Sequence, residues 1–392
     1  MRIVDAKARI VLNSRGDPAI EVEINGFSES VPSGASKGSY EANKIDVEEA
    51  IKLFNSELVD LLKTYDIQTL GDLKNFENDL ELIGGIKKYG SNLILAIEYA
   101  ILRAWSFHYN EPIYSFFNKK PNIKNIRILA NVVGGGAHAK WRSTTVQEYL
   151  ISPRINNLKV AIFLASYYHK LLGERLELLD EKFMYGKNDE GAWTTSLKTH
   201  TLLNVLRNLS ESLEKEYSIK IDIGIDLAAT HIFNNSVYVF ENKKYSKEEF
   251  IRTVLDIIKD YNLFYIEDPL HEDDFEGFSE INKETRAIVA GDDLTVTNIE
   301  RIEKAIKQNS IKAVIIKPDQ AGSIIRTIEA IEFCKKNDII PIFSHRSGET
   351  ESNIIAHLAV AFEVPYVKFG IIGGERISKL NELLRIYEKI GS

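Results

Sequence analysis

Residues 287–317, AIVAGDDLTVTNIERIEKAIKQNSIKAVIIK, contain one complete repeat of the pattern that decides the fold. An apolar run ends at Asp292, a segment with helical spacing follows, and a second apolar run ends at Lys317. The two apolar runs have the length of strands, and the segment between them has the length of a helix. A strand, a helix and a second strand in this order form a unit whose two strands lie parallel in one sheet.

Six apolar runs in residues 221–368 end in a side chain that can do chemistry. Most of them recur at intervals of roughly 25 residues, which is near the length of one strand–helix unit in a (β/α)₈ barrel. The C-terminal ends of the strands in such a barrel all open onto one mouth. We therefore expect six residues to converge there: Asp226, Glu267, Asp292, Lys317, His345 and Lys368.

Helical patterns separate these runs, and right-handed crossovers through such helices would close the strands into a barrel. Two of the helices begin with a capping box, one at Ser246 and one at Thr297. Residues 128–133 and 146–151 are close in sequence with no obvious helix between them, so they can pair as a hairpin instead of forming a strand–helix unit. The helices that we expect cover residues 158–179, 199–217, 247–261, 298–308, 323–337, 349–362 and 375–390.

The first part of the chain has a different order of elements. Apolar residues alternate with glutamates in residues 20–24, which predicts a strand with one buried face. Helical patterns follow in residues 47–62 and from Ser91 onward. Strands followed by helices, without alternation, indicate an α+β module. We therefore predict an α/β protein in which a smaller α+β capping domain, residues 1–121, precedes a barrel domain, residues 122–392.

The composition narrows the class of protein. The 392 residues carry a formal net charge of −8, which argues against nucleic acid as the main partner. Cys334 is the only cysteine, so a disulfide within the chain is excluded and a reducing compartment is expected. Residues 1–7 are too charged for a signal peptide, and no uncharged run reaches the roughly 18 residues of a membrane span. We expect a cytoplasmic protein without a membrane partner.

Three acids follow three consecutive strands of the predicted barrel. Asp226, Glu267 and Asp292 offer hard oxygen ligands, a set that favours Mg²⁺ over Zn²⁺. A single acid after a strand is usually a solvated loop residue or a helix cap, but three at one mouth favour a metal site. Because side chains alternate along a strand, we expect Asp268 and Asp293 to face away from this site.

Lys317 follows an apolar run, so the stem of its side chain is expected to be buried. Desolvation, a nearby metal and the charge of Lys368 would each lower the pKa of such a lysine. A lysine that is neutral part of the time can act as a general base near neutral pH. The alternative is a structural salt bridge to one of the acids, which the neighbouring metal site makes the weaker interpretation.

Further polar groups lie in residues expected to form loops. Residues 344–350, SHRSGET, stand between a strand end and a helix start, where the side chains of Arg346 and Ser347 could bind an oxyanion or a phosphate. Taken alone, His138 would be a structural histidine and Glu190 a loop acid. Glu148 is more suggestive, because an acid on a barrel strand needs a partner if it points inward.

Several strings of residues, taken together, resemble the enolase family. The resemblance runs from Ser14 to Ile386, so it covers nearly the whole chain. It implies an enolase-type barrel and a hydro-lyase, phosphopyruvate hydratase, that converts 2-phosphoglycerate to phosphoenolpyruvate in glycolysis and gluconeogenesis. The most specific strings are VPSGAS (Val31–Ser36), IEDP (Ile266–Pro269), DDLTVTN (Asp292–Asn298) and SHRSGET (Ser344–Thr350).

The resemblance also implies roles for single residues. Lys317 would remove the proton at C2 of the substrate. Glu190, with Glu148 acting through water or a hydrogen-bond chain, would protonate the leaving C3 hydroxyl. Lys368 would neutralise the carboxylate, and the phosphate would be held by the 344–350 segment. The residues expected to contact the substrate are His138, Lys368, His345, Arg346 and Ser347.

Two Mg²⁺ ions per active site are a further implication of the resemblance. Asp226, Glu267 and Asp292 would bind the first ion, and Ser36, in a loop of the small domain, would help to bind the second. This chemistry, a Lys base beside Mg²⁺ that stabilises an enediolate, is a known pattern of the enolase superfamily. The resemblance also implies at least a homodimer, or a larger homo-oligomer built from dimers.

Departures from the family pattern leave alternatives open. They include Lys37, the bulkier and more basic Lys140–Arg142, and Phe369, and none of them removes a catalytic group. One alternative is a paralogue that uses the same proton abstraction on another acid. Another is a catalytically retired binding scaffold, which the retained acids and Lys317 argue against. An ultraviolet assay for the conjugated enol phosphate, with and without Mg²⁺, separates these interpretations.

Overall fold

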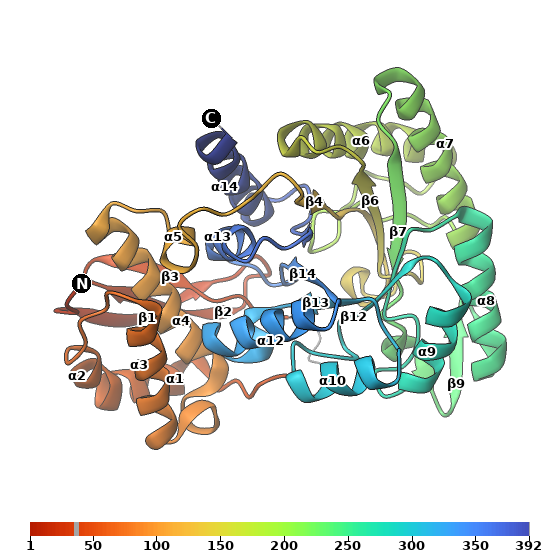
Figure 1. Ribbon diagram of the computed structural model, residues 1–392. Helices are drawn as coiled ribbons and strands as arrows, with labels where there is room; N and C mark the ends of the chain where they lie inside the picture. The colour runs from red at the N-terminus through yellow and green to blue at the C-terminus, as the bar shows by residue number, and fades with distance from the viewer. Residues whose placement is uncertain (35–38, 392) are drawn as a thin grey trace.

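The computed structural model describes residues 1–34 and 39–391 (Figure 1). Its larger sheet has the hydrogen-bonded order β4-β15-β14-β13-β12-β11-β7-β6-β5. Only Leu129 separates β4 from β5, and its N–H donates to the Val367 carbonyl on β15 at 2.8 Å. The two ends of the order are therefore halves of one strand, and the sheet closes into the predicted barrel. Its strands are β4 (Arg127–Ile128), β5 (Ala130–Gly134), β6 (Glu148–Pro153), β7 (Ile221–Asp226), β11 (Tyr265–Glu267), β12 (Ile288–Gly291), β13 (Ala313–Ile316), β14 (Ile340–Ser344) and β15 (Tyr366–Lys368).

The hairpin interpretation of the first barrel segments is correct. β5 and β6 pair antiparallel, with Ala130 opposite Ile151, and β6 also runs antiparallel to β7. Because β6 is reversed, its first residue, Glu148, lies opposite Asp226, the last residue of β7. A side chain at the start of β6 therefore reaches the same mouth as the side chains at the ends of the parallel strands.

Helices surround this ring, and most of them lie where the sequence predicts them (Figure 1). The helix expected at 349–362 begins only at Ile354, because the Glu349 carbonyl accepts from Ser14 N–H and is unavailable to a helix. The prediction of a capping box at Thr297 is also wrong, because the side chain of Asn298 caps α10. The helices are α6 (Leu158–Leu179), α7 (Thr199–Tyr217), α8 (Lys247–Tyr261), α9 (Phe275–Glu284), α10 (Ile299–Lys307), α11 (Pro318–Ala321), α12 (Ile324–Lys336), α13 (Ile354–Ala361) and α14 (Gly374–Gly391).

Shorter helices and strands lie in the connections between the barrel strands and helices. A three-stranded antiparallel sheet follows β7, and single turns of 3-10 helix follow β5 and β7. In residues 1–34 and 39–391, no helix is both long and apolar enough to cross a lipid bilayer. The short elements are η2 (Gly136–Ala139), η3 (Ala229–Ile232), β8 (Phe233–Asn234), β9 (Val237–Phe240) and β10 (Lys243–Tyr245).

The N-terminal part forms a separate sheet with its own helices, drawn in red and orange beside the barrel in Figure 1. The α+β class is confirmed for this part. Residues 118–126 connect it to β4, and the limit placed between residues 121 and 122 stays a prediction. Its elements are β1 (Ala6–Leu12), β2 (Pro18–Ile24), β3 (Phe27–Ser30), α1 (Val47–Leu53), η1 (Phe54–Leu58), α2 (Val59–Leu62), α3 (Leu70–Leu82), α4 (Gly85–Tyr109) and α5 (Tyr114–Phe117).

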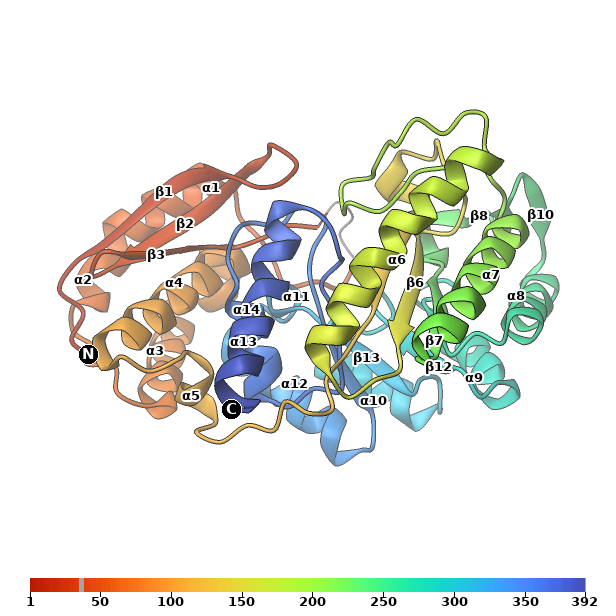
Figure 2. The same ribbon diagram turned by 90° about the horizontal axis from the view of Figure 1, so that it is seen from above.

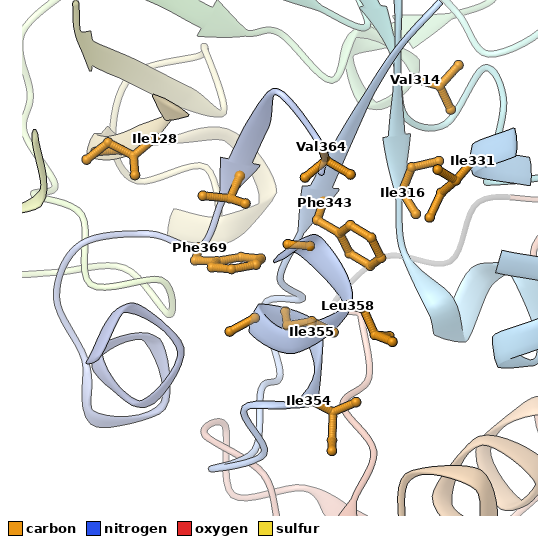
Figure 3. Close-up of a cluster of buried hydrophobic side chains, with 14 of the residues drawn as sticks. Ile128, Val314, Ile316, Ile331, Phe343, Ile354, Ile355, Leu358, Val364 and Phe369 are labelled. Carbon is orange, nitrogen blue, oxygen red and sulfur yellow. The ribbon is translucent and has the colours of Figure 1, made fainter. Parts of the chain in front are cut away.

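Apolar side chains of the barrel strands and of α13 form a continuous core (Figure 3). Phe343 on β14 and Phe369 after β15 lie over Ile355 and Leu358 of α13 in this view, and all four are buried. Each buried side chain of this size stabilises the fold by about 1.5–3 kcal/mol. The core therefore holds β14 and the end of β15 rigid just below the barrel mouth.

Two glutamates of the N-terminal part contact the start of α12. Glu98 Oε2 accepts the Ile324 N–H at 2.8 Å, and Glu77 accepts the Ser323 hydroxyl at 2.8 Å. Burial raises the pKa of Glu98 well above its ordinary value, and the charge of Glu77 raises it further. The Ile324 hydrogen bond only partly opposes these effects. Burial therefore favours the protonated form of Glu98 in the folded protein.

We expect Glu98→Gln to reduce the loss of stability at high pH. The pKa of Glu98 is raised on folding, so its contribution is fully present below the unfolded value of about 4.3 and falls as pH rises. Glutamine mimics the protonated acid at every pH. The variant should match the wild type near pH 4 and become the more stable protein above it, by about 1.4 kcal/mol for each pKa unit.

Urea unfolding at pH 4.5 and pH 8 measures this difference. Glu81→Gln is the matched control, because Glu81 lies on α3 at the same junction but is exposed and pairs with Arg326 at 2.9 Å. A free energy of unfolding that falls by the same amount at both pH values in Glu98→Gln would contradict the prediction.

Candidate active site

Charged residues stand at the ends of the barrel strands and gather at one mouth. Asp226, Glu267 and Lys368 are the last residues of their strands, and the other three residues follow theirs directly. Apart from Glu267, all of the six line one pocket. The pocket is also lined by five other residues that the sequence singles out: His138, Glu148, Glu190, Arg346 and Ser347.

Lys368 stands at the centre of an acidic group. Its Nζ lies 3.0 Å from Glu148 Oε2, 3.2 Å from Asp226 Oδ2 and 2.9 Å from both carboxylate oxygens of Glu267. Burial opposes the charge of Lys368, but the neighbouring carboxylates outweigh it and raise the pKa of Lys368 well above its ordinary value. Lys368 is therefore a fixed positive charge in the floor of the pocket.

Glu267 lies beneath the pocket, fully buried. The Tyr265 hydroxyl donates to its Oε2 at 2.6 Å, on the carboxylate that also contacts Lys368. Burial, followed by the charge of Asp226, raises the pKa of Glu267 to about 8. A cation bound nearby would lower this pKa, because it would favour the ionised form of Glu267 against the effects of burial and of Asp226.

Lys317 contacts the carboxylate of Asp292, and Gln320 Nε2 donates to the other oxygen of Asp292 at 3.1 Å. Burial acts to lower the pKa of Lys317, as the sequence predicts, but the charge of Asp292 outweighs burial. The pKa of Lys317 is therefore raised, and the predicted direction is wrong for the protein without a metal ion. The ammonium of Lys317 is the present counter-ion of Asp292.

The second acid of each pair does not face away from the site. Asp268 and Asp293 both line the pocket, and Asp268 accepts the N–H groups of Asp292 and Asp293 at 3.0 and 2.6 Å. The strand alternation has ended at Asp268, because its φ of 40° lies in the left-handed region. The rule of alternate faces applies only inside the strand, and this expectation is wrong.

Glu190 lies between two histidines on the far side of the pocket. His138 Nδ1 lies 3.4 Å from Glu190 Oε1, His345 Nε2 lies 3.7 Å from Oε2, and Asn131 donates to Oε2 at 3.0 Å. Burial acts to raise the pKa of Glu190, but the charge of His138 outweighs burial and holds this pKa well below its usual range. Glu190 is therefore the charged member of this group.

The pKa of Glu148 is shifted in the opposite direction to that of Glu190. Burial raises the pKa of Glu148 well above its ordinary value, and the charges of Glu190 and Asp226 raise it further, against the effect of Lys368. Ligand atoms of Glu148, Glu190 and His138 lie within 4.8 Å of one another. The pKa values of two neighbouring buried carboxyl groups are thus shifted in opposite directions, which favours the protonated form of Glu148 and the ionised form of Glu190.

Arg346 is held by acids of two different parts of the chain. Its Nη2 lies 2.9 Å from Glu41 Oε1, in the N-terminal part, and its Nη1 lies 3.4 Å from Asp319 Oδ2. Burial acts to lower the pKa of Arg346, but Asp319 and Glu41 outweigh it and raise this pKa. Sequence reasoning missed Glu41 and Asp319, and no periodic pattern marks them because they approach the site only in the folded chain.

Backbone hydrogen bonds join the segment after β14 to the N-terminal part. Ser33 and Gly348 exchange N–H and carbonyl bonds at 2.8 and 2.9 Å, and a Cβ at Gly348 would lie 2.7 Å from the Ser33 carbonyl oxygen. This close approach requires glycine at position 348. Ser36 and Lys37, which the sequence also singles out, lie outside the described residues.

Comparisons with known proteins identify the architecture. The family model "Enolase, N-terminal domain" matches residues 3–117, and the model "Enolase, C-terminal TIM barrel domain" matches residues 127–392. The chain belongs to the enolase family. A curated enolase of Methanothermobacter thermautotrophicus is 36% identical over 99% of this chain and 97% of its own length. An enolase of Pyrobaculum aerophilum is 35% identical over 100% of this chain and 97% of its own.

Membership of the enolase family makes the chain a lyase of the phosphopyruvate hydratase class, which acts in glycolysis. The general reaction is the dehydration of 2-phosphoglycerate, so the substrate is a small phosphorylated acid. An enolase of Natronomonas pharaonis is a third relative, 36% identical over 98% of both chains. The resemblance noted in the sequence is confirmed, whereas the roles of single residues are not tested by these comparisons.

The enolase family generally uses Mg²⁺, and the residues at this mouth fit a hard divalent cation. The acids at the strand ends provide only carboxylate oxygens, which such ions prefer. Lysines balance these acids in the present structure, and burial, followed by the charge of Asp226, raises the pKa of Glu267. Among the described residues, the all-carboxylate group whose ligand atoms lie within 4.8 Å of one another is Asp268, Asp292 and Asp293, and not the predicted set of Asp226, Glu267 and Asp292. Cation binding is thus compatible with the donor set.

Proposed function

We propose that this chain converts 2-phosphoglycerate to phosphoenolpyruvate with Lys317 as the base and with Glu190 and Glu148 as the acid pair. The order of the strands around the barrel is the observation that supports this proposal. Lys317 follows β13 and Glu148 begins β6, and three strands lie between them on either side of the ring when β4 and β5 count as one. A substrate in the pocket would therefore have a base on one side and an acid on the other. Removal of a proton and of a hydroxyl from opposite faces needs this arrangement.

The first chemical step would remove the proton at C2 of the substrate. This proton is weakly acidic, because its loss places a second negative charge on the neighbouring carboxylate. Mg²⁺ bound at the mouth would supply the positive charge that stabilises such an intermediate. The residues that would hold the first ion are Asp226, Glu267 and Asp292, and Ser36 would help to hold the second.

Lys317 must lose its own proton before it can act as a base. The contact with Asp292 now favours the charged form of Lys317. An Asp292 carboxylate that faces a divalent cation would hold the lysine proton less strongly, because the cation competes for the same negative charge. Lys368 keeps its charge and would neutralise the substrate carboxylate.

The second step would expel the C3 hydroxyl with a proton from the acid pair. Burial raises the pKa of Glu148, whereas the charge of His138 lowers the pKa of Glu190 against the effect of burial. We propose that Glu190 delivers this proton after receiving it from Glu148, directly or through water. His138 and His345 would line the pocket, and Arg346 with Ser347 would bind the phosphate through a guanidinium fork and a hydroxyl.

Glu190→Gln is expected to separate the two steps. Glutamine keeps the size of the side chain but carries no acidic proton, so dehydration should fall by about 10²–10⁴-fold. Lys317 is untouched, so exchange of the C2 proton with D₂O, followed by NMR of the recovered substrate, should persist. Dehydration is measured as ultraviolet absorbance of the conjugated enol phosphate.

Asp189→Asn is the matched control, because Asp189 is the neighbouring acid and pairs with Arg15 at 3.0 Å instead of with a histidine of the pocket. It should retain more of both activities than Glu190→Gln does. Loss of C2 exchange together with dehydration in Glu190→Gln would contradict the assignment. Activity of the wild type on another acid, with none on 2-phosphoglycerate, would refute the proposed substrate.

A cytoplasmic location and a homodimer or larger homo-oligomer stay predictions from the sequence. We propose both for this chain as a member of its family. Neither affects the chemistry above, because every residue assigned to the reaction belongs to the same chain.

A further inference from the structure

Arg376 is the largest of the fully buried side chains among the described residues. It lies in the first turns of α14, a helix that stands between the N-terminal sheet and α6 when the molecule is seen from above (Figure 2). No motif or periodic pattern in the sequence marks Arg376. A buried guanidinium is costly unless its donors are satisfied, so the partners of Arg376 indicate what it does.

The strong hydrogen bonds of Arg376 go to backbone carbonyls. Nη1 donates to the Arg346 carbonyl at 2.7 Å, and Nη2 donates to the Ser347 and Asp189 carbonyls, both at 3.0 Å. In the part of the chain that is described, the carboxylate oxygen recorded nearest to Arg376 is Glu375 Oε1, 3.7 Å from Nε. Arg376 is therefore not primarily half of an ion pair.

The three carbonyls belong to two separate segments, which we name the anion loop (residues 344–350) and the acid loop (residues 188–191). The anion loop carries Arg346 and Ser347, and the acid loop carries Glu190, which directly follows Asp189. A guanidinium presents its N–H groups in a rigid planar fork. The fork of Arg376 therefore fixes the position of one loop relative to the other.

We propose that Arg376 is a positioning residue that sets the distance between the phosphate site and the acid Glu190. This inference rests on the proposed function, because it uses the roles given there to Arg346, Ser347 and Glu190. Arg376 acts through the backbone of the two loops and does not line the pocket within the described residues. A substrate whose phosphate is held by the anion loop would then have its C3 hydroxyl within reach of the acid loop.

The surroundings of Arg376 leave little room for another arrangement. A Cβ on Gly370 would lie 3.1 Å from Arg376 Cδ and 3.1 Å from His345 Cε1. The Ser347 carbonyl also accepts from the Ser14 hydroxyl at 3.1 Å, and the Asp189 side chain pairs with Arg15. Each loop therefore has a second, outer contact with the β1–β2 turn, whereas Arg376 contacts both loops from the inside.

The test compares two rates at saturating 2-phosphoglycerate and Mg²⁺. Dehydration needs both loops in place, whereas exchange of the C2 proton needs Lys317, which lies in neither loop. In Arg376→Gln we expect the ratio of dehydration to exchange to fall by about 10-fold or more, because a misplacement of about 1 Å can cost up to 10²-fold. Arg376→Lys keeps the charge but loses the fork, so its ratio should fall less, and KM should rise in both variants.

Arg385→Gln is the matched control, since Arg385 lies on the same helix but is exposed and pairs with Glu382 at 2.8 Å. It should leave both rates unchanged. Equal falls in dehydration and exchange in the Arg376 variants, or no fall in either, would overturn the inference. Glu190→Gln, measured alongside, shows whether the proposed acid role holds independently of Arg376.

Thermal unfolding shows whether the Arg376 variants are folded at the assay temperature. If they are not, Gly370→Ala provides the test, because its methyl group would lie 3.1 Å from Arg376 Cδ and from His345 Cε1, so that both side chains must shift by a few tenths of an ångström without being removed. This variant should lower the same ratio. An unchanged ratio in folded Gly370→Ala, with a shifted melting temperature alone, would overturn the inference.

Discussion

Replacement of Lys317 by alanine is expected to lower kcat by about 10²–10⁴-fold, the usual contribution of a positioned general base. Exchange of the C2 proton with D₂O should disappear at the same time, because no other group is assigned to remove that proton. This double loss distinguishes the base from the acid, whose replacement should leave exchange in place. Both rates are measured on the same preparation, by ultraviolet absorbance and by NMR.

The control for Lys317→Ala is Lys307→Ala on α10, where the lysine side chain is exposed and pairs with Glu303 at 2.8 Å. It should keep full activity. Removal of Lys317 leaves Asp292 with less positive charge nearby, so binding of Mg²⁺ should persist or strengthen in the variant. Retention of C2 exchange in a folded Lys317→Ala protein would refute the base assignment.

Removal of divalent cations is expected to abolish activity and to lower the melting temperature, and addition of Mg²⁺ should restore both. A ligand that binds only the folded protein stabilises it by about 2.7 kcal/mol at 100 times its Kd. The change in melting temperature is therefore a readout that does not depend on catalysis. Mg²⁺ binds the ionised carboxylates, and these groups become protonated at low pH. The stabilisation by Mg²⁺ should therefore be weaker at low pH.

Glu267→Gln tests the metal site at one residue. The variant keeps the hydrogen bond from Tyr265 but loses a carboxylate charge, so Mg²⁺ affinity should fall by at least the 10–100-fold typical of groups that support a metal. Titration of the melting temperature with Mg²⁺ measures this shift. Glu280→Gln, on the exposed face of α9, should titrate as the wild type does. Equal affinities in both variants would exclude Glu267 as a ligand.

Strand periodicity predicts the part of the site that lies on the strands. The runs before Glu267 and Lys317 end where β11 and β13 end, because a parallel strand that is buried on both faces is apolar until it reaches the mouth. Family resemblance adds the residues whose surroundings have no periodic pattern, such as His138 and Glu190.

Other features depend on contacts that no local pattern encodes. Glu41, Asp319 and Arg376 reach the site from a distant module, from a short helix and from the last helix, so only the folded chain reveals them. The raised pKa of Lys317 and the inward position of Asp268 have a similar origin. The first follows from a contact with Asp292, and the second from one left-handed residue after a strand.

Closure of the ring has a consequence for the newborn polypeptide. β4 pairs with β15, so the strand edge at Arg127 and Ile128 stays unpaired until Tyr366 and Val367 have been synthesised. At about 5–20 residues per second, the ribosome needs on the order of 10–50 s to add the intervening residues. During this interval the nascent barrel carries an open edge that invites wrong partners. Lys368 also emerges at that late moment, so a prematurely terminated chain has neither a sealed barrel nor a complete site.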